Sequence, residues 1–139
     1  MATHLIKLAV GIRDVEHLEE VQRTRAAERE NLAVRRAFTR HKPVRPDVVG
    51  NSLYWVIQGV IRCRQRLIGF EQELDAEGRR YCLFLLDPEL VGVIPTQRGP
   101  FQGWRYLSPE VAPPDLTTGA DGELPSDEML KELRSLGLI

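Results

Sequence analysis

The sequence contains few of the residues that usually carry metal or nucleophilic chemistry. Its 139 residues include two cysteines and three histidines, and none of these stands in the CxxC, HxxxH or HExxH spacing of a zinc site. It also has no GxxxxGKS/T or GxGxxG phosphate loop and no GxSxG nucleophile turn. The members of a nucleophile triad need only meet in space, and the sequence identifies none. We therefore predict no metal site and no bound cofactor.

Long uninterrupted hydrophobic runs are also missing. A membrane-spanning helix needs roughly 20 apolar residues, whereas the longest apolar stretch, Asn51–Phe70, carries three arginines in its second half. The first residues lack both the basic segment and the cleavage site of a signal peptide. Cys63 and Cys82 lie in apolar strand-like runs, where a buried free thiol is expected rather than a disulfide. These features predict a cytoplasmic protein without a membrane partner.

The overall charge is nearly neutral, but its distribution is uneven. Hydrophobic residues make up 42% and charged residues 28% of the chain, which is ordinary for a globular protein, and the net charge is −1. Residues 34–66 hold eight Arg or Lys against one acid, whereas residues 107–139 hold seven acids against two basic residues. A basic centre with an acidic tail indicates either nucleic-acid contact or pairing between tail and body.

The stretch Asn51–Phe70 organises the rest of the chain. Its β-branched residues and Gly59 disfavour a helix, and its second half alternates with a period of two. We predict one long strand that bends at Gly59. In this strand Ile61, Cys63, Gln65 and Leu67 would occupy one face, and Arg62, Arg64 and Arg66 the other.

The segments around this stretch predict the remaining elements. Asp14 is placed to cap a helix from Val15 to about Asn31. Before Asn51 we expect strands at His4–Val10 and Val34–Arg40, a basic loop at Lys42–Pro46 and a short helical element at Asp47–Gly50. After Phe70 we expect a turn at Asp75–Gly78 and strands at Arg80–Leu86, at Leu90–Ile94 closed by Pro95, and at Phe101–Leu107.

Together these elements predict an α+β fold. We expect a bent, mostly antiparallel sheet or partly open β-barrel of five or six strands, with one long helix packed against it. Residues 1–109 would form a single domain. Residues 110–139 would form an acidic tail containing Pro and Gly, and its short helix, Asp127–Leu136, would dock on the body or on a partner.

Four strings of the sequence resemble a known family. HLIKLAVG, LYWVIQGVIRCRQR, LDPEL and PFQGWRYL occur in this order, as in the alphaproteobacterial proteins grouped as domain of unknown function 1489. The resemblance covers Met1 to about Leu116 and implies no reaction. The order of a basic strand, a Pro-containing element and a long Tyr-Trp strand also resembles the PUA and ASCH pseudo-barrels. That resemblance implies a partly open barrel that binds RNA or modified nucleobases.

The candidate site residues favour a nucleic-acid or nucleotide ligand. Arginines two apart on a strand stand about 6.6–6.8 Å apart, which is comparable to the spacing of phosphates on an extended strand. An aromatic side chain can stack a base, and an amide can read a base edge. We predict RNA binding by Arg40, Lys42, Arg45, Arg62, Arg64, Arg66, Gln102, Trp104, Arg105 and Tyr106. The alternative is structural: the arginines pair with carboxylates of a neighbouring strand, and Trp55, Phe101 and Trp104 are core aromatics.

Two other functions stay open. Small ASCH-type amidohydrolases use a lysine, a threonine and a glutamate, and this resemblance makes Thr39 and Lys42 the catalytic candidates for a nucleobase-like or anionic substrate. Their order is reversed relative to that family, and no glutamate can be assigned. A third hypothesis is an adaptor whose acidic C-terminal helix binds a protein partner. The sequence specifies neither the natural ligand nor the oligomeric state.

Overall fold

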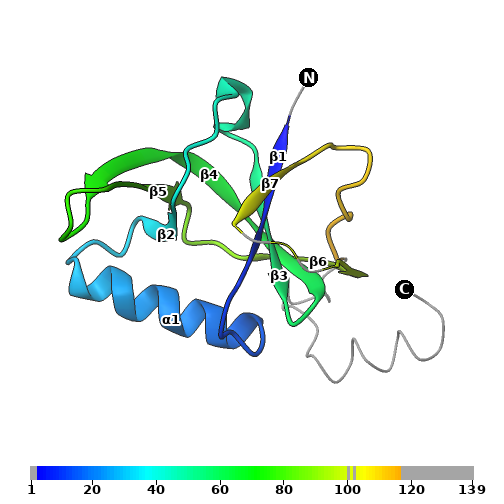
Figure 1. The fold of residues 1–139 in the computed structure, drawn as a ribbon. Helices are drawn as coiled ribbons and strands as arrows, with labels where there is room; N and C mark the ends of the chain where they lie inside the picture. The colour runs from blue at the N-terminus through cyan, green and yellow to red at the C-terminus, as the bar shows by residue number, and fades with distance from the viewer. Residues whose placement is uncertain (1–2, 100, 102, 117–139) are drawn as a thin grey trace.

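The computed structural model describes residues 3–99, 101 and 103–116, which form a seven-stranded sheet with one α-helix (Figure 1). The elements are β1 His4–Leu8, α1 Val15–Glu28, β2 Arg35–Thr39, the 3₁₀ turn η1 Pro46–Val48, β3 Ser52–Ile57, β4 Val60–Leu74, β5 Arg80–Leu86, β6 Val91–Gln97 and β7 Trp104–Leu107.

The sheet order is β2-β5-β4-β3-β1-β7, and β6 also pairs with β4. Five of the six strand pairings are antiparallel, and only β1 with β3 is parallel within these residues. The predicted α+β class and bent, mostly antiparallel sheet are confirmed, but the sheet has seven strands instead of the five or six expected.

The predicted single long strand is wrong, because Asn51–Phe70 folds as a β-hairpin. β3 ends at Ile57, β4 begins at Val60, and these two residues are paired. Gln58 and Gly59 between them have φ values of 49° and 80°. Positive φ at both central residues is the conformation of a type I′ turn, whose twist suits a two-residue hairpin. Gly59 therefore reverses the chain instead of bending a continuous strand.

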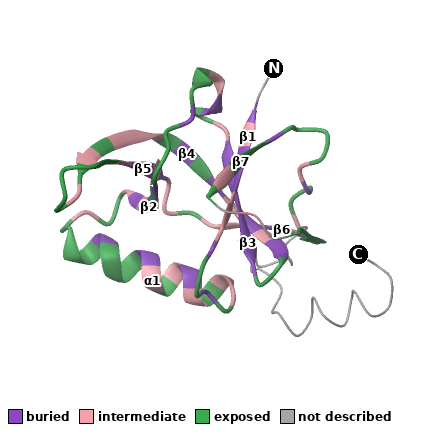
Figure 2. Ribbon diagram, viewed as in Figure 1, coloured by how far each residue is buried: buried purple, intermediate pink, exposed green. Residues whose placement is uncertain are grey.

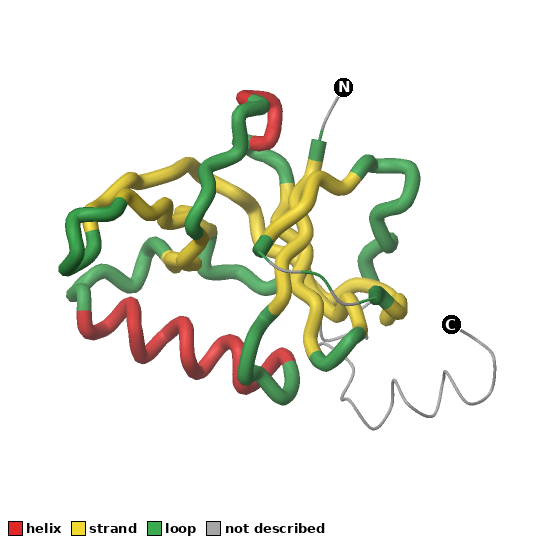
Figure 3. The backbone as a smooth tube through the Cα atoms, viewed as in Figure 1, coloured by secondary structure: helices red, strands yellow, loops and turns green. Residues whose placement is uncertain are grey.

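β4 holds the sheet together by changing partners along its length. Its first half pairs with β3 and β6, and its second half pairs with β5. The register shifts between Leu67 and Gly69, which is where the partner changes. A bulge of this kind bends a strand and increases its twist. The lobe of β4, β5 and β2 consequently turns over α1, while β3, β1, β6 and β7 lie to the other side (Figure 1; loops and strands are coloured in Figure 3).

The two faces of the sheet bury two separate hydrophobic clusters. Leu5 of β1 belongs to the larger cluster with α1, and its neighbour Ile6 belongs to the smaller one. The burial pattern follows this division, since β1 and β3 are buried on both faces and α1 is buried only toward the sheet (Figure 2). Alternate residues of a strand point to opposite faces, so both faces of these two strands are apolar.

The predicted faces of β4 are confirmed only in part. Cys63 and Leu67 lie in the larger cluster and Gln65 is fully buried, as expected. Ile61 lies in the smaller cluster instead. The register shifts between Ile61 and Cys63, and this irregularity moves Ile61 to the other face. Strict alternation cannot anticipate such a bulge.

A buried polar network joins α1 to the sheet. The side-chain amides of Gln22 and Gln65 exchange two hydrogen bonds, of 2.9 and 2.7 Å. Trp55 Nε1 donates to Gln65 Oε1 at 2.8 Å, and Gln65 Nε2 also donates to the Asp87 carbonyl at 3.0 Å. All the hydrogen-bonding atoms of the Gln65 amide are thus satisfied inside the protein.

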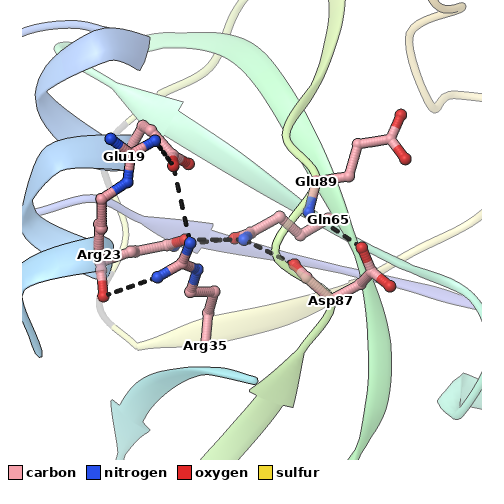
Figure 4. Close-up of polar contacts among 7 residues, drawn as sticks. Glu19, Arg23, Arg35, Gln65, Asp87 and Glu89 are labelled. Carbon is pink, nitrogen blue, oxygen red and sulfur yellow. Dashed lines mark hydrogen bonds and ion pairs between the residues drawn. The ribbon is translucent and has the colours of Figure 1, made fainter. Parts of the chain in front are cut away.

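An arginine continues this network toward the helix surface (Figure 4). The side chain of Arg35 is 6% exposed, and it donates to the Gln22 carbonyl at 3.4 Å. It also lies 3.7 Å from Glu19, which Arg23 contacts at 2.9 Å. The network fixes α1 over β2 and β4 through hydrogen bonds as well as through apolar packing.

Several boundaries differ from those expected. α1 is capped by Asp14, which accepts from the His17 amide at 2.7 Å, but it ends at Glu28. β6 continues through Pro95 to Gln97. Proline is tolerated there because the β4–β6 pairing is irregular and one N–H can be missing.

The segment after β7 lies against β6 as far as the structure describes it. Ile94 donates to the Pro114 carbonyl and Leu116 donates to the Gly92 carbonyl, both at 2.9 Å. The predicted tail helix at Asp127–Leu136 lies outside the described residues, and the domain boundary near residue 109 stays a prediction. In the described part of the chain, no helix is long and apolar enough to cross a membrane.

Candidate nucleic-acid interface

The loop after β2 is held on the two aromatic residues of β7. Trp104 Nε1 donates to the His41 carbonyl at 2.7 Å. The Tyr106 hydroxyl accepts from the backbone amides of Val44 and Arg45 at 3.1 and 3.3 Å. Alternation along β7 predicts that both rings share a face, and they do, edge to face with their centroids 4.9 Å apart. The structure therefore brings together two predicted parts of the site that are about 60 residues apart in the chain.

A cavity of about 390 Å³ lies beside Tyr106. Arg45, Arg98 and Tyr106 contribute to its wall, together with Thr3, Leu107, Ser108, Pro109 and Val111. The Arg45 guanidinium lies 5.8 Å from the Tyr106 ring centroid, within the range of a cation–π contact. Two cationic groups and one aromatic ring thus line one open hollow.

Asp47 orients Arg45 at the edge of this cavity. Arg45 donates two hydrogen bonds to the Asp47 carboxylate, both of 3.2 Å, and Thr3 donates a third, of 2.8 Å. The hydrogen bonds from Thr3 and Arg45 lower the pKa of Asp47. Asp47 occupies Nε and Nη2 of Arg45, but the Arg45 side chain is 52% exposed, so a further anion can still approach it.

Phe101 holds two more arginines near β7. The guanidinium carbons of Arg98 and Arg105 lie 5.4 and 5.6 Å from the Phe101 ring centroid. Sequence reasoning predicted Arg105 but missed Arg98, which it assigned only to a turn. The available signal was its position three residues before Phe101. Gln102, the predicted base reader, lies outside the described residues.

The arginine row on β4 is not a continuous cationic track. Arg64 donates to Asp115 through Nε at 2.7 Å and Nη2 at 2.6 Å, and through Nη1 to Ser52 at 3.1 Å. The hydrogen bond between the two residues raises the pKa of Arg64 and lowers that of Asp115. Arg62 is half-buried at the bulge, and Arg66 is exposed. Arg64 therefore pairs with a carboxylate, as the alternative expected, but this carboxylate comes from the segment after β7 and not from a neighbouring strand.

The remaining predicted residues lie near the end of β2. Arg40 pairs with Asp75 at 3.3 Å. Thr39 is buried opposite Cys82, and Lys42 Nζ lies 5.6 Å from the Phe70 ring centroid. In the described part of the chain, neither Thr39 nor Lys42 forms a hydrogen bond or ion pair with a carboxylate. Their catalytic role stays a prediction.

The cysteines and acids do not assemble a reactive site in the described ranges. Cys63 and Cys82 are free and buried, as predicted. Burial raises the pKa of Cys63 to about 12, which keeps the thiol protonated and unreactive. Among the residues described, no group of three or more His, Cys, Asp or Glu side chains is placed to hold a metal ion.

Comparison with known proteins identifies a family and no function. Searches against curated proteins and against solved structures give no match. A family model described as protein of unknown function, DUF1489, matches residues 5–139. The match extends beyond the region of the four strings and includes the acidic C-terminal segment. The chain therefore belongs to the DUF1489 family.

Proposed function

We propose that this protein is a nucleic-acid-binding module with a preference for single-stranded RNA. The ligand would lie on the β7 surface, which we define as Lys42, Arg45, Arg98, Trp104, Arg105 and Tyr106. The observation that carries the proposal is the cavity in which Arg45, Arg98 and Tyr106 meet. Guanidinium groups bind phosphate, and aromatic side chains stack bases without regard to sequence.

The geometry assigns different roles to the candidates. Arg45 and Arg98 would contact phosphate, and Tyr106 would offer its ring to a base, since its side chain is 37% exposed. Trp104 would position the loop through its bond to His41. Gln102 keeps its proposed role in reading a base edge. Arg62 and Arg66 would add long-range attraction, whereas Asp75 and Asp115 offset the charges of Arg40 and Arg64.

We further propose that the protein is bacterial and cytoplasmic and that its fold resembles the PUA and ASCH pseudo-barrels. Support for that likeness comes from the curled sheet, whose end strand β7 receives the loop that follows the opposite end strand, β2. A sheet of this shape is a barrel that stops short of closure.

Fluorescence anisotropy with a labelled single-stranded RNA of about 12 nucleotides tests the proposal. Affinity should fall linearly with the logarithm of the salt concentration. The double variant Arg45→Gln/Arg98→Gln should bind at least tenfold more weakly, with a salt slope reduced by about 1 to 2 units, because each lost phosphate contact removes about one unit.

The matched control is Arg23→Gln/Arg79→Gln, which removes the same charge from sites away from β7. Arg23 pairs with Glu19 and Arg79 pairs with Glu77, and all four side chains are partly or largely exposed. This variant should keep the wild-type affinity within about twofold. Equal affinities of the two double variants would overturn the assignment of the β7 surface. An equal affinity for single-stranded DNA would overturn the preference for RNA.

A further inference from the structure

A second cavity, of about 270 Å³, opens between α1 and the two strands where the sheet fails to close. We call it the helix pocket. Its walls are the end of β1 and the residues after it, the inner side of α1, the middle of β2 and Trp55. β7 pairs with β1 only as far as Lys7, opposite Trp104, so the chain from Leu8 onward continues beyond the end of β7. The cavity therefore occupies the gap in the barrel.

The lining of this pocket is mostly apolar, and its charged residues are all cations. Leu8, Ala9, Val10, Ile12, Leu18, Val21, Ala37, Phe38 and Trp55 provide the apolar surface. Lys7, Arg25 and Arg36 provide the charges, and none of the lining residues that the structure describes is acidic. The amide network of Gln22, Gln65 and Trp55 fixes one wall. A pocket that is mostly apolar with a few convergent polar groups is the usual form of a small-molecule site.

Arg36 carries a buried donor that has no acceptor among the described residues. Its Nε donates to Glu71 at 3.0 Å, and its side chain is 18% exposed. Its Nη1 is buried and has no hydrogen-bond partner in the described part of the chain. An unsatisfied buried donor costs about 1–3 kcal/mol, and more when it is charged. Arg36 lines the pocket, so its positive charge would attract an anion there.

Lys7 is a second cation without a counter-charge. It projects from the same face of the sheet as its cross-strand partner Trp55, and the residue is half-buried. Burial lowers its pKa, and no carboxylate of the described residues opposes this effect. Among residues 3–99, 101 and 103–116, Lys7 forms no ion pair. A desolvated ammonium without a counter-charge is costly in the empty pocket and is stabilised next to an anion.

We propose that the helix pocket binds a small organic anion, with its carboxylate or phosphate group between Lys7, Arg25 and Arg36 and its flat apolar part against Leu18, Val21 and Trp55. The volume lies just below the range of about 300–1,000 Å³ that is usual for ligand sites, so it suits a small molecule of one or two rings. None of these residues belongs to the β7 surface. The helix pocket is thus independent of the proposed nucleic-acid interface.

Isothermal titration calorimetry on the full chain tests this proposal with three probes: 2-naphthoate, phenyl phosphate and the neutral 2-naphthamide. At least one anion should bind, and 2-naphthamide should bind at least tenfold more weakly than 2-naphthoate. Binding of phenyl phosphate in preference to 2-naphthoate would identify phosphate as the anionic group of the same site. No binding of either anion at millimolar concentration, or equal binding of 2-naphthoate and 2-naphthamide, would overturn the proposal.

Two pairs of variants locate the anion. Lys7→Met and Arg25→Gln should each weaken anion binding at least fivefold, whereas Arg23→Gln, on the same helix but outside the pocket, should leave it unchanged. Glu71→Gln removes the carboxylate partner of Arg36 and should leave binding equal or tighter. Lys7→Met is expected to fold, because it removes a desolvated charge and keeps the apolar stem. Unchanged anion binding by Lys7→Met would overturn the site.

The same variants separate this proposal from the proposed function. Lys7→Met should bind single-stranded RNA within about twofold of the wild type at 150 mM salt. Arg45→Gln/Arg98→Gln should conversely keep its affinity for 2-naphthoate. If Lys7→Met lost binding of both RNA and 2-naphthoate, the two surfaces would be one site, and the helix pocket would not be independent of the β7 surface.

Discussion

Gln65 is fully buried, and each polar atom of its side-chain amide takes part in two hydrogen bonds. Its Oε1 accepts from Gln22 and Trp55, and its Nε2 donates to Gln22 and to the Asp87 carbonyl. The sequence places Gln65 on an inward face by alternation, but it gives no sign of these partners, which lie 10 to 43 residues away. A buried polar residue of this kind specifies how a helix is seated, because its partners must all be in register.

Replacement of this residue should measure the value of the network. Gln65→Leu leaves the Trp55 N–H, the Gln22 amide and the Asp87 carbonyl without a partner, so the free energy of unfolding should fall by about 3 kcal/mol. Urea denaturation followed by circular dichroism checks this value. The control is Gln72→Leu on the exposed end of the same strand, which should change stability by less than about 0.5 kcal/mol. Equal stabilities of the two variants would show that the network contributes nothing.

At the scale of elements, the β3–β4 hairpin shows where local patterns are insufficient. The alternation on both sides of Gly59 is visible in the sequence, and it is equally consistent with one bent strand and with two paired strands. Asn-Gly is the strong signal for a two-residue turn, and Gln58-Gly59 lacks it. What decides the outcome is the pairing of Leu53 with Gln65 and of Trp55 with Cys63, which buries both strands. Only tertiary packing distinguishes the two possibilities.

The turn itself makes a prediction that a continuous bent strand does not. Gly59 has φ of 80°, and a Cβ there would meet no atom within 4 Å, so Gly59→Ala should cost only the left-handed conformation, about 1–2 kcal/mol. Gly69→Ala, within β4, without a positive φ and with equally open space, should be neutral or slightly stabilising. Gln58→Asn should raise stability by a few tenths of a kcal/mol, because asparagine tolerates φ of 49° better than glutamine. Thermal denaturation compares the three, and a Gly59→Ala variant as stable as Gly69→Ala would contradict the turn.

At the scale of the whole molecule, the elements were more predictable than their assembly. The apolar periodicity and capping residues located α1 and most strands, since these signals are local. The pairing of Arg64 in the arginine row could not be predicted from nearby residues, because its partner Asp115 lies 51 residues further along the chain. The contact between the basic loop and β7 likewise depends on the curvature of the sheet, and the bulges in β4 produce that curvature. The candidate residues were therefore recognisable by type, whereas the cavity with Arg98 and the helix pocket were not.

Charge is the property of the whole molecule that most directly bears on a polyanionic ligand. Residues 117–139 contain five acidic and two basic residues, so their net charge is −3, and the chain without them would change from −1 to +2. Repulsion between these acidic residues and a polyanionic ligand acts over the Debye length, which is longer at low salt. The acidic segment should therefore weaken RNA binding most at low ionic strength.

Removal of residues 117–139 tests this expectation and leaves the contacts of Asp115 and Leu116 with the body in place. The shortened chain should bind single-stranded RNA several-fold more tightly than the full chain at 50 mM salt and within about twofold at 300 mM salt. The full-length variant Asp127→Asn/Glu128→Gln/Glu132→Gln has the same net charge of +2, from −1 plus three, and should reproduce the gain. Tighter binding by the shortened chain alone, or at both salt concentrations alike, would mean that the segment covers the surface sterically. Unchanged binding at 50 mM salt by both forms would show that the acidic segment does not regulate the β7 surface.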